Sequence, residues 1–128
     1  MNHLLLIAAG GALGALSRHG VNQAALRVLG PEFPMGTLLV NVLGSFAIGV
    51  LVGWLALAGR PDATEIRFAI GVGFLGAFTT MSAFSLDLVL MIERKAYFEA
   101  LLYGAGTITV CVIAVIAGMV LARRVVGI

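Results

Sequence analysis

The architecture of this chain depends most on one hydrophobic segment, which reads Gly71-Val72-Gly73-Phe74-Leu75-Gly76-Ala77-Phe78-Thr79-Thr80-Met81-Ser82-Ala83-Phe84-Ser85. Three glycines are followed by four hydroxyl side chains within seven residues. Glycine weakens helix interiors, and a broken helix at membrane depth is tolerated only where protein or a cavity covers the freed backbone. We therefore expect a break near residues 76–80, where freed carbonyls could bind a cation and freed N–H groups an anion. The alternative is a helix that merely kinks, with Ser and Thr hydroxyls bonded back to its own carbonyls.

This segment is one of four that are long and apolar enough to cross a bilayer. Of the 128 residues, 61% are hydrophobic and only 11% are charged, whereas soluble domains are about 45–50% apolar and about 25% charged. A spanning helix needs about 20 mostly apolar residues. Four segments qualify, at residues 4–26, 35–57, 66–92 and 97–122. The sequence therefore predicts an all-α membrane protein, in which residues 1–128 form a single four-helix transmembrane domain.

The turns between the spans are short, and small residues mark the helix faces that pack together. Gly59 is typical of a helix C-terminus, and Thr64 is expected to cap the helix that follows. The spacing Gly10-x-x-x-Gly14 in the first span and Ser45-x-x-x-Gly49-x-x-x-Gly53 in the second predicts close helix packing. That pattern concerns association of helices and says nothing of function.

The basic residues are almost evenly divided between the two sides of the membrane. Four spans place both termini on one side, together with the second turn. That side carries Arg60, Arg67, Arg123 and Arg124, whereas the other side carries Arg27, Arg94 and Lys95. Orientation normally follows a clear cytoplasmic excess of positive charge. Either the first helix decides the orientation alone, or the chain inserts both ways and pairs with an inverted copy of itself.

Several functional classes are not expected from the residue types. The net charge of +2 comes from scattered basic residues, so no nucleic-acid partner is expected. Cys111 is the only cysteine, and neither a metal-ligand spacing nor a nucleophile–base pair is present, so an enzyme is not expected. Asp87 is the only carboxylate clearly inside a span, and it lies toward the end. A proton-coupled exporter would be expected to carry an embedded acid nearer the middle.

Polar side chains inside the spans are costly and therefore become candidates for function. Arg18, late in the first span, either snorkels to the interface or supplies an anion-attracting or structural charge at a water-filled vestibule. Asn41 either joins helices by a hydrogen bond or lends an N–H donor to an anion path. In the fourth span, Tyr103, Thr107 and Cys111 are four residues apart and share a helix face. This stripe is either a hydrated track or an interfacial Tyr beside a Thr that bonds its own backbone.

Three stretches of the chain resemble the signature motifs of the Fluc (CrcB) family of fluoride channels. They are Gly10-Gly11-Ala12-Leu13-Gly14-Ala15-Leu16-Ser17-Arg18, Gly36-Thr37-Leu38-Leu39-Val40-Asn41 and Gly73-Phe74-Leu75-Gly76-Ala77-Phe78-Thr79-Thr80-Met81-Ser82-Ala83-Phe84-Ser85. Their order, the span count and the chain length also match, so the resemblance covers the whole chain. It implies a multi-pass protein of the bacterial inner (plasma) membrane, surrounded by lipid. It also implies an antiparallel, dual-topology homodimer with two pores and a structural sodium ion at the dimer interface.

The resemblance also implies roles for individual residues. Backbone carbonyls of Gly76 and Thr79 from both subunits would hold the sodium ion, and Arg18 would lie near the vestibule. The expected pore-lining residues are Asn41, Met81, Ser82, Phe84, Tyr103 and Thr107. The sequence departs from the family at Met81, where a first pore phenylalanine is usual, and at Ala77, where a glycine is usual. Methionine is flexible and polarizable but lacks the positive edge of an aromatic ring.

These observations lead to one leading hypothesis and two alternatives. The leading hypothesis is a passive, fluoride-selective channel that exports fluoride and lowers its cytoplasmic concentration. A narrow path of N–H and O–H donors could replace the water shell of fluoride stepwise and exclude the larger chloride. The alternatives are a small dual-topology secondary transporter and a membrane subunit that packs against a partner without transporting.

Overall fold

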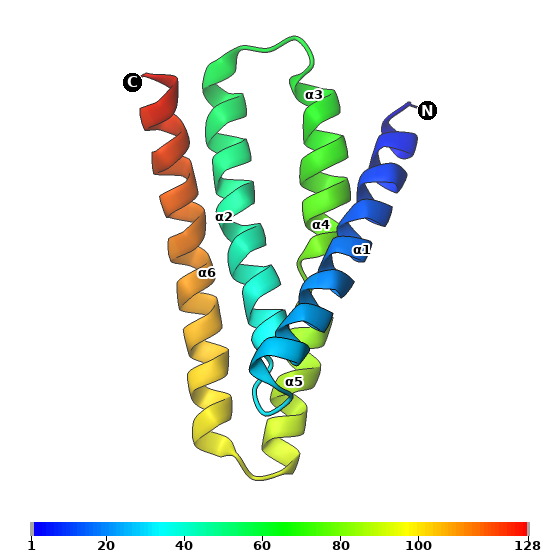
Figure 1. The fold of residues 1–128 in the computed structure, drawn as a ribbon. Coiled ribbons are helices and arrows are strands. Elements are labelled where there is room, and N and C mark those ends of the chain that lie inside the picture. Colours follow the sequence, from blue (N-terminus) through cyan, green and yellow to red (C-terminus); the bar gives the residue numbers. More distant parts are fainter. Residues whose placement is uncertain (1, 128) are drawn as a thin grey trace.

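The computed structural model describes residues 2–127 as a bundle of long helices (Figure 1). In chain order its elements are α1 (Asn2–Leu29), α2 (Met35–Ala58), α3 (Ala63–Ile66), the π-helical η1 (Arg67–Leu75), α4 (Gly76–Phe78), α5 (Met81–Glu93) and α6 (Tyr97–Val126). Taken together, α3 to α5 form one segment, Ala63–Glu93, and this segment and the three other long helices have the length and composition to cross a membrane. The four predicted spans are confirmed, each with slightly wider bounds.

The spans run up and down, so that their ends gather in two groups. Figure 1 shows both termini and the α2–α3 turn at the top, with the α1–α2 and α5–α6 turns at the bottom. Helices α2 and α6 lie side by side along their length, whereas α1 crosses the upper part of the third segment. The expected placement of both termini on one side is therefore confirmed.

Glycines bring two of these helix pairs into close contact. A Cβ added at Gly14 of α1 would overlap the carbonyl oxygen of Phe74 in η1, and one added at Gly73 would meet the carbonyl of Ile7. In the other pair, a Cβ at Gly49 of α2 would overlap the Val115 carbonyl of α6. Only a residue without a side chain lets the backbones approach this closely. The packing faces predicted from the small-residue spacing are confirmed.

The turn between α2 and α3 confirms the prediction for Gly59 and contradicts the one for Thr64. Gly59 ends α2 in the left-handed conformation with φ of 52°, as expected. Thr64 does not cap the next helix, because α3 already begins at Ala63. Asp62 precedes that helix, and its carboxylate accepts two hydrogen bonds of 2.7 Å from Arg60 instead of capping. The Arg60 guanidinium thereby lowers the pKa of the Asp62 carboxyl.

The third span is broken in the middle, as predicted. Helix α4 ends at Phe78, and Thr79 and Thr80 are extended, with ψ of 159° and 111°. Helix α5 then begins at Met81. Gly76 remains helical, with φ of −61° and ψ of −35°, so the opening lies at the two threonines rather than at the glycine. The π-helical turns of η1, which the sequence did not predict, precede the break where α1 packs closest.

Candidate functional site

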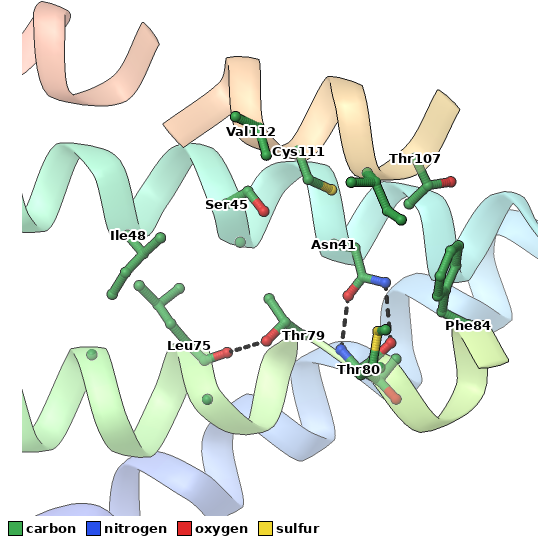
Figure 2. Close-up of a pocket in the computed structure, with 15 residues that line it drawn as sticks. Asn41, Ser45, Ile48, Leu75, Thr79, Thr80, Phe84, Thr107, Cys111 and Val112 are labelled. Atoms are coloured by element: carbon green, nitrogen blue, oxygen red, sulfur yellow. Dashed lines mark hydrogen bonds between the residues drawn. The ribbon is translucent and has the colours of Figure 1, made fainter. Parts of the chain in front are cut away.

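The break is held open by the side chain of Asn41, which reaches across from α2. The Thr80 backbone N–H donates to Asn41 Oδ1 at 2.8 Å, and Asn41 Nδ2 donates to the Thr80 carbonyl at 3.1 Å (Figure 2). One amide therefore satisfies both backbone groups of an extended residue that has left the helix. The interhelical hydrogen bond considered for Asn41 is present, and the role of the same side chain as an anion donor stays a prediction.

The two threonines of the break form hydrogen bonds to the helices on either side, Thr80 to α5 and Thr79 to the end of η1. Thr80 Oγ1 accepts a 3.1 Å hydrogen bond from the Ala83 N–H and lies 3.2 Å from Ser82 Oγ, so Thr80 is the N-cap of α5. On the other side, the N–H and the hydroxyl of Thr79 both donate to the Leu75 carbonyl, at 3.1 and 3.0 Å. The Thr79 carbonyl accepts a hydrogen bond of 3.3 Å from Arg18 Nη1.

A groove of about 450 Å³ runs beside the break, between α2 and α6 on one side and the third segment on the other (Figure 2). Six predicted site residues line it, namely Asn41, Gly76, Thr79, Met81, Phe84 and Thr107. Ser82 is exposed and adjoins the groove through its contact with Thr80. Arg18 and Tyr103 do not line it. The structure thus gathers most of the predicted site around one opening.

Along α6 the groove carries one hydroxyl that has no partner. Thr107 is only 5% exposed, and within the described chain its Oγ1 is buried without a hydrogen bond. Cys111, four residues further along α6, lines the same groove. The alternative that Thr107 bonds its own backbone is therefore wrong, although Thr109 does so, donating to the Ala105 carbonyl at 2.8 Å. Buried hydroxyls in proteins usually have a partner, so the unpaired Thr107 Oγ1 beside the groove is a candidate polar group of the site.

Tyr103 is buried inside the bundle, the side that the α6 stripe was expected to face. It is 2% exposed, and its hydroxyl donates to Asp87 Oδ2 at 3.0 Å. Its ring packs on Phe84 and Phe33, with centroids 5.2 and 5.4 Å apart. This burial does not fix the depth of Tyr103 in the membrane, so the interfacial position stays a prediction. Its pore-lining role stays a prediction, since its hydroxyl proton is directed at the carboxylate and away from the groove.

Sequence reasoning missed this contact between Asp87 and Tyr103, although a signal existed. The two residues lie eight positions before and eight after Lys95, at the turn between α5 and α6. Residues equally distant from the turn of an antiparallel hairpin face each other. Asp87 also lines a second cavity of about 320 Å³, at the end of the bundle that holds the α1–α2 turn. Asn22 Oδ1, in the same lining, is buried without a partner in the described chain.

Comparison with known proteins places nearly the whole chain in one group. A family model described as "CrcB-like protein, Camphor Resistance (CrcB)" matches residues 5–119. A protein of Caulobacter vibrioides named "Fluoride-specific ion channel FluC" is 47% identical over 125 residues, which cover 98% of each chain. Proteins with the same name from Phenylobacterium zucineum and Hyphomonas neptunium are 50% and 44% identical, again over 98% of each chain.

Proposed function

This chain belongs to the CrcB family, and on that basis we propose that it is a passive, fluoride-selective channel. It is a multi-pass protein of the bacterial plasma membrane and lets fluoride leave a fluoride-loaded cytoplasm. The observation that carries the proposal is the broken third span, whose backbone is held by Asn41 beside a groove with a buried, unpaired hydroxyl. The names of the relatives support the same ion.

Fluoride is small and strongly hydrated, so a path must offer donors that replace its water step by step. Thr107 and Ser82 offer hydroxyl groups at or beside the groove, and neither donates to a backbone carbonyl. The amide of Asn41 carries two N–H bonds, and one of them remains after the bond to Thr80. Phe84 presents an aromatic ring whose edge is positive. Chloride is larger and gains less from hydrogen-bond donors than fluoride does, so a narrow donor path favours fluoride although chloride is easier to dehydrate.

The working unit is an antiparallel pair of chains. Met81 is 69% exposed in one protomer, although the chain places it next to the break. Ser82 beside it is exposed as well. A second, inverted copy would cover these residues and close the groove into a pore. The near balance of basic residues on the two sides supports insertion in both orientations.

A structural sodium ion at the dimer interface completes the proposal, and the residues at the break fit it. In an unbroken helix the Gly76 carbonyl would accept from the Thr80 N–H, but that N–H donates to Asn41. The Gly76 carbonyl is thereby released, and the Thr79 carbonyl accepts one bond, from Arg18, which leaves a second lone pair. Carbonyls of an unwound helix are suitable sodium ligands. When bound, the ion would supply positive charge that balances carbonyls from two chains.

Fluoride efflux from liposomes that contain only this chain tests the function. Vesicles loaded with potassium fluoride should release fluoride when a potassium ionophore lets potassium leave and balance the charge, and vesicles loaded with potassium chloride should release almost none. Efflux should be the same with and without a proton gradient, because the transport is passive. Equal release of both anions, or none of fluoride, contradicts the proposal. Flux that requires a proton gradient would favour the secondary transporter instead.

A further inference from the structure

Arg18 reaches the break from the side opposite the groove. Its Nη1 donates to the Thr79 carbonyl at 3.3 Å, and the side chain is half-buried. The ion pairs among residues 2–127 are Arg60–Asp62 and Arg94–Glu99, so no carboxylate neutralises Arg18 in the described chain. The contact that compensates its charge is therefore a backbone carbonyl of the interrupted helix.

The position of Arg18 follows from the packing of α1. Gly10, Gly14 and Arg18 are four residues apart and share one face of the helix. Gly10 packs against the Ala69 carbonyl, and Gly14 packs against the Phe74 carbonyl one turn later. The next turn of α1 brings the guanidinium to Thr79. The two close glycine contacts thus fix where this charge lies, and snorkelling is not needed to explain it.

A positive charge at this place is complementary to the end of a helix. The continuous helical run of η1 and α4 ends at Phe78, immediately before the break. A helix C-terminus carries partial negative charge that favours a cation. Water is scarce at membrane depth, so a charged hydrogen bond is stronger there than at an exposed surface. Arg18 holds Thr79 from one side, while Asn41 holds Thr80 from the other.

We propose that Arg18 is a positioning residue that shares the Thr79 carbonyl with the structural sodium ion. This inference rests on the sodium site of the proposed function. The guanidinium and the sodium ion would each offset the partial negative charge at the Thr79 carbonyl. The fold therefore depends less on either cation when the other is present. Two positive charges this close also repel each other. Removing the guanidinium therefore makes the fold depend more strongly on sodium.

Thermal unfolding of the purified full-length chain in detergent tests this coupling. The melting temperature is measured in sodium chloride and in N-methylglucamine chloride of equal ionic strength. For Arg18→Gln, which removes the charge at similar length, we expect the stabilisation by sodium to exceed that of the wild type by about 4 °C. Arg18→Lys keeps the charge and should respond to sodium much as the wild type does. The matched control is Arg27→Gln, because Arg27 is an exposed arginine of the same helix.

The outcomes separate clearly. A sodium response of Arg18→Gln equal to that of the wild type overturns the proposal, as does an equally enlarged response of Arg27→Gln. If Arg18→Gln yields no folded protein in either salt, Arg18→Lys decides. A folded Arg18→Lys with a wild-type sodium response supports the shared charge, and an unfolded one overturns it. Fluoride efflux of the wild type is measured separately, so a chain without flux contradicts the proposed function and leaves the sodium comparison interpretable.

Discussion

Asn41 keeps a break in a helix stable where there is little water to solvate it. An unpaired backbone group buried in a protein costs about 1–3 kcal/mol, and leaving the helix frees both groups of Thr80. A side-chain amide carries one acceptor and two donors, so it can satisfy both groups and keep one N–H. Aspartate lacks the donor, and serine has a single oxygen with which to reach both. The residue type at position 41 therefore follows from the backbone it supports.

The first prediction concerns the pairing of Asn41 with Thr80. Asn41→Ala should lower the stability of the chain by about 2 kcal/mol, because two backbone groups at the break lose their partner. It should also abolish most fluoride efflux. Thermal unfolding in detergent and the liposome assay measure the two effects. Ser45→Ala is the control, since Ser45 lies one turn along α2 in the same groove and has no side-chain hydrogen bond in the described chain. Equal losses in both variants would contradict the assigned role.

A second prediction concerns the departure at Met81. Met81→Phe should raise the rate of fluoride efflux several-fold, because the edge of an aromatic ring attracts an anion and a thioether does not. Met81→Leu, which introduces another non-aromatic side chain of similar size, should leave the rate of fluoride efflux unchanged. A rate for Met81→Phe at or below that of the wild type would contradict the prediction.

At the scale of elements, the four spans, their short turns and the break were predictable from the sequence, because all three depend on local composition. Helix propensity is low at Thr79, at Thr80 and at the glycines before them, and this can be predicted from the sequence alone. The partners of the break were not predictable in the same way. Arg18 meets Thr79 across 61 residues of chain and Asn41 meets Thr80 across 39, and such pairings depend on how α1 and α2 pack. The π-helical turns of η1, which pack against α1, were likewise not predicted from the sequence.

A third prediction tests that packing with two glycines of the same helix. Gly14→Ala should destabilise the chain by about 1–3 kcal/mol, because the new Cβ would overlap the Phe74 carbonyl and push α1 away from η1. Gly20→Ala should be neutral or stabilising by up to about 1 kcal/mol, because no atom other than the backbone of its own helix lies within 4 Å of its Cβ position, and alanine favours helix. Thermal unfolding of both variants measures the contrast. Equal effects would mean that α1 does not pack as described.

At the scale of the whole molecule, the two ends of the bundle differ little in charge, and this bears on how the chain inserts. Four basic residues lie on the side of the termini and three on the other side, whereas a clear excess normally fixes orientation. A chain that pairs with an inverted copy of itself, as proposed above, needs both orientations in one membrane. Under that proposal a near balance of charge is a requirement of assembly, and a small change in loop charge should remove one of the two populations.

The fourth prediction follows from that requirement. Thr64→Lys with Glu65→Lys adds positive charge on the side of the termini, and Glu32→Lys with Glu93→Lys adds it on the other side, all at exposed positions. Each double variant alone should insert in one orientation and lose fluoride efflux, and co-expression of the two should restore it. Reporter fusions at the C-terminus measure orientation, and glutamine at the same four positions is the control. Full efflux from one double variant held in a single orientation would show that this chain conducts without an inverted partner, because no opposite copy would be present to close the groove beside Thr79 and Thr80.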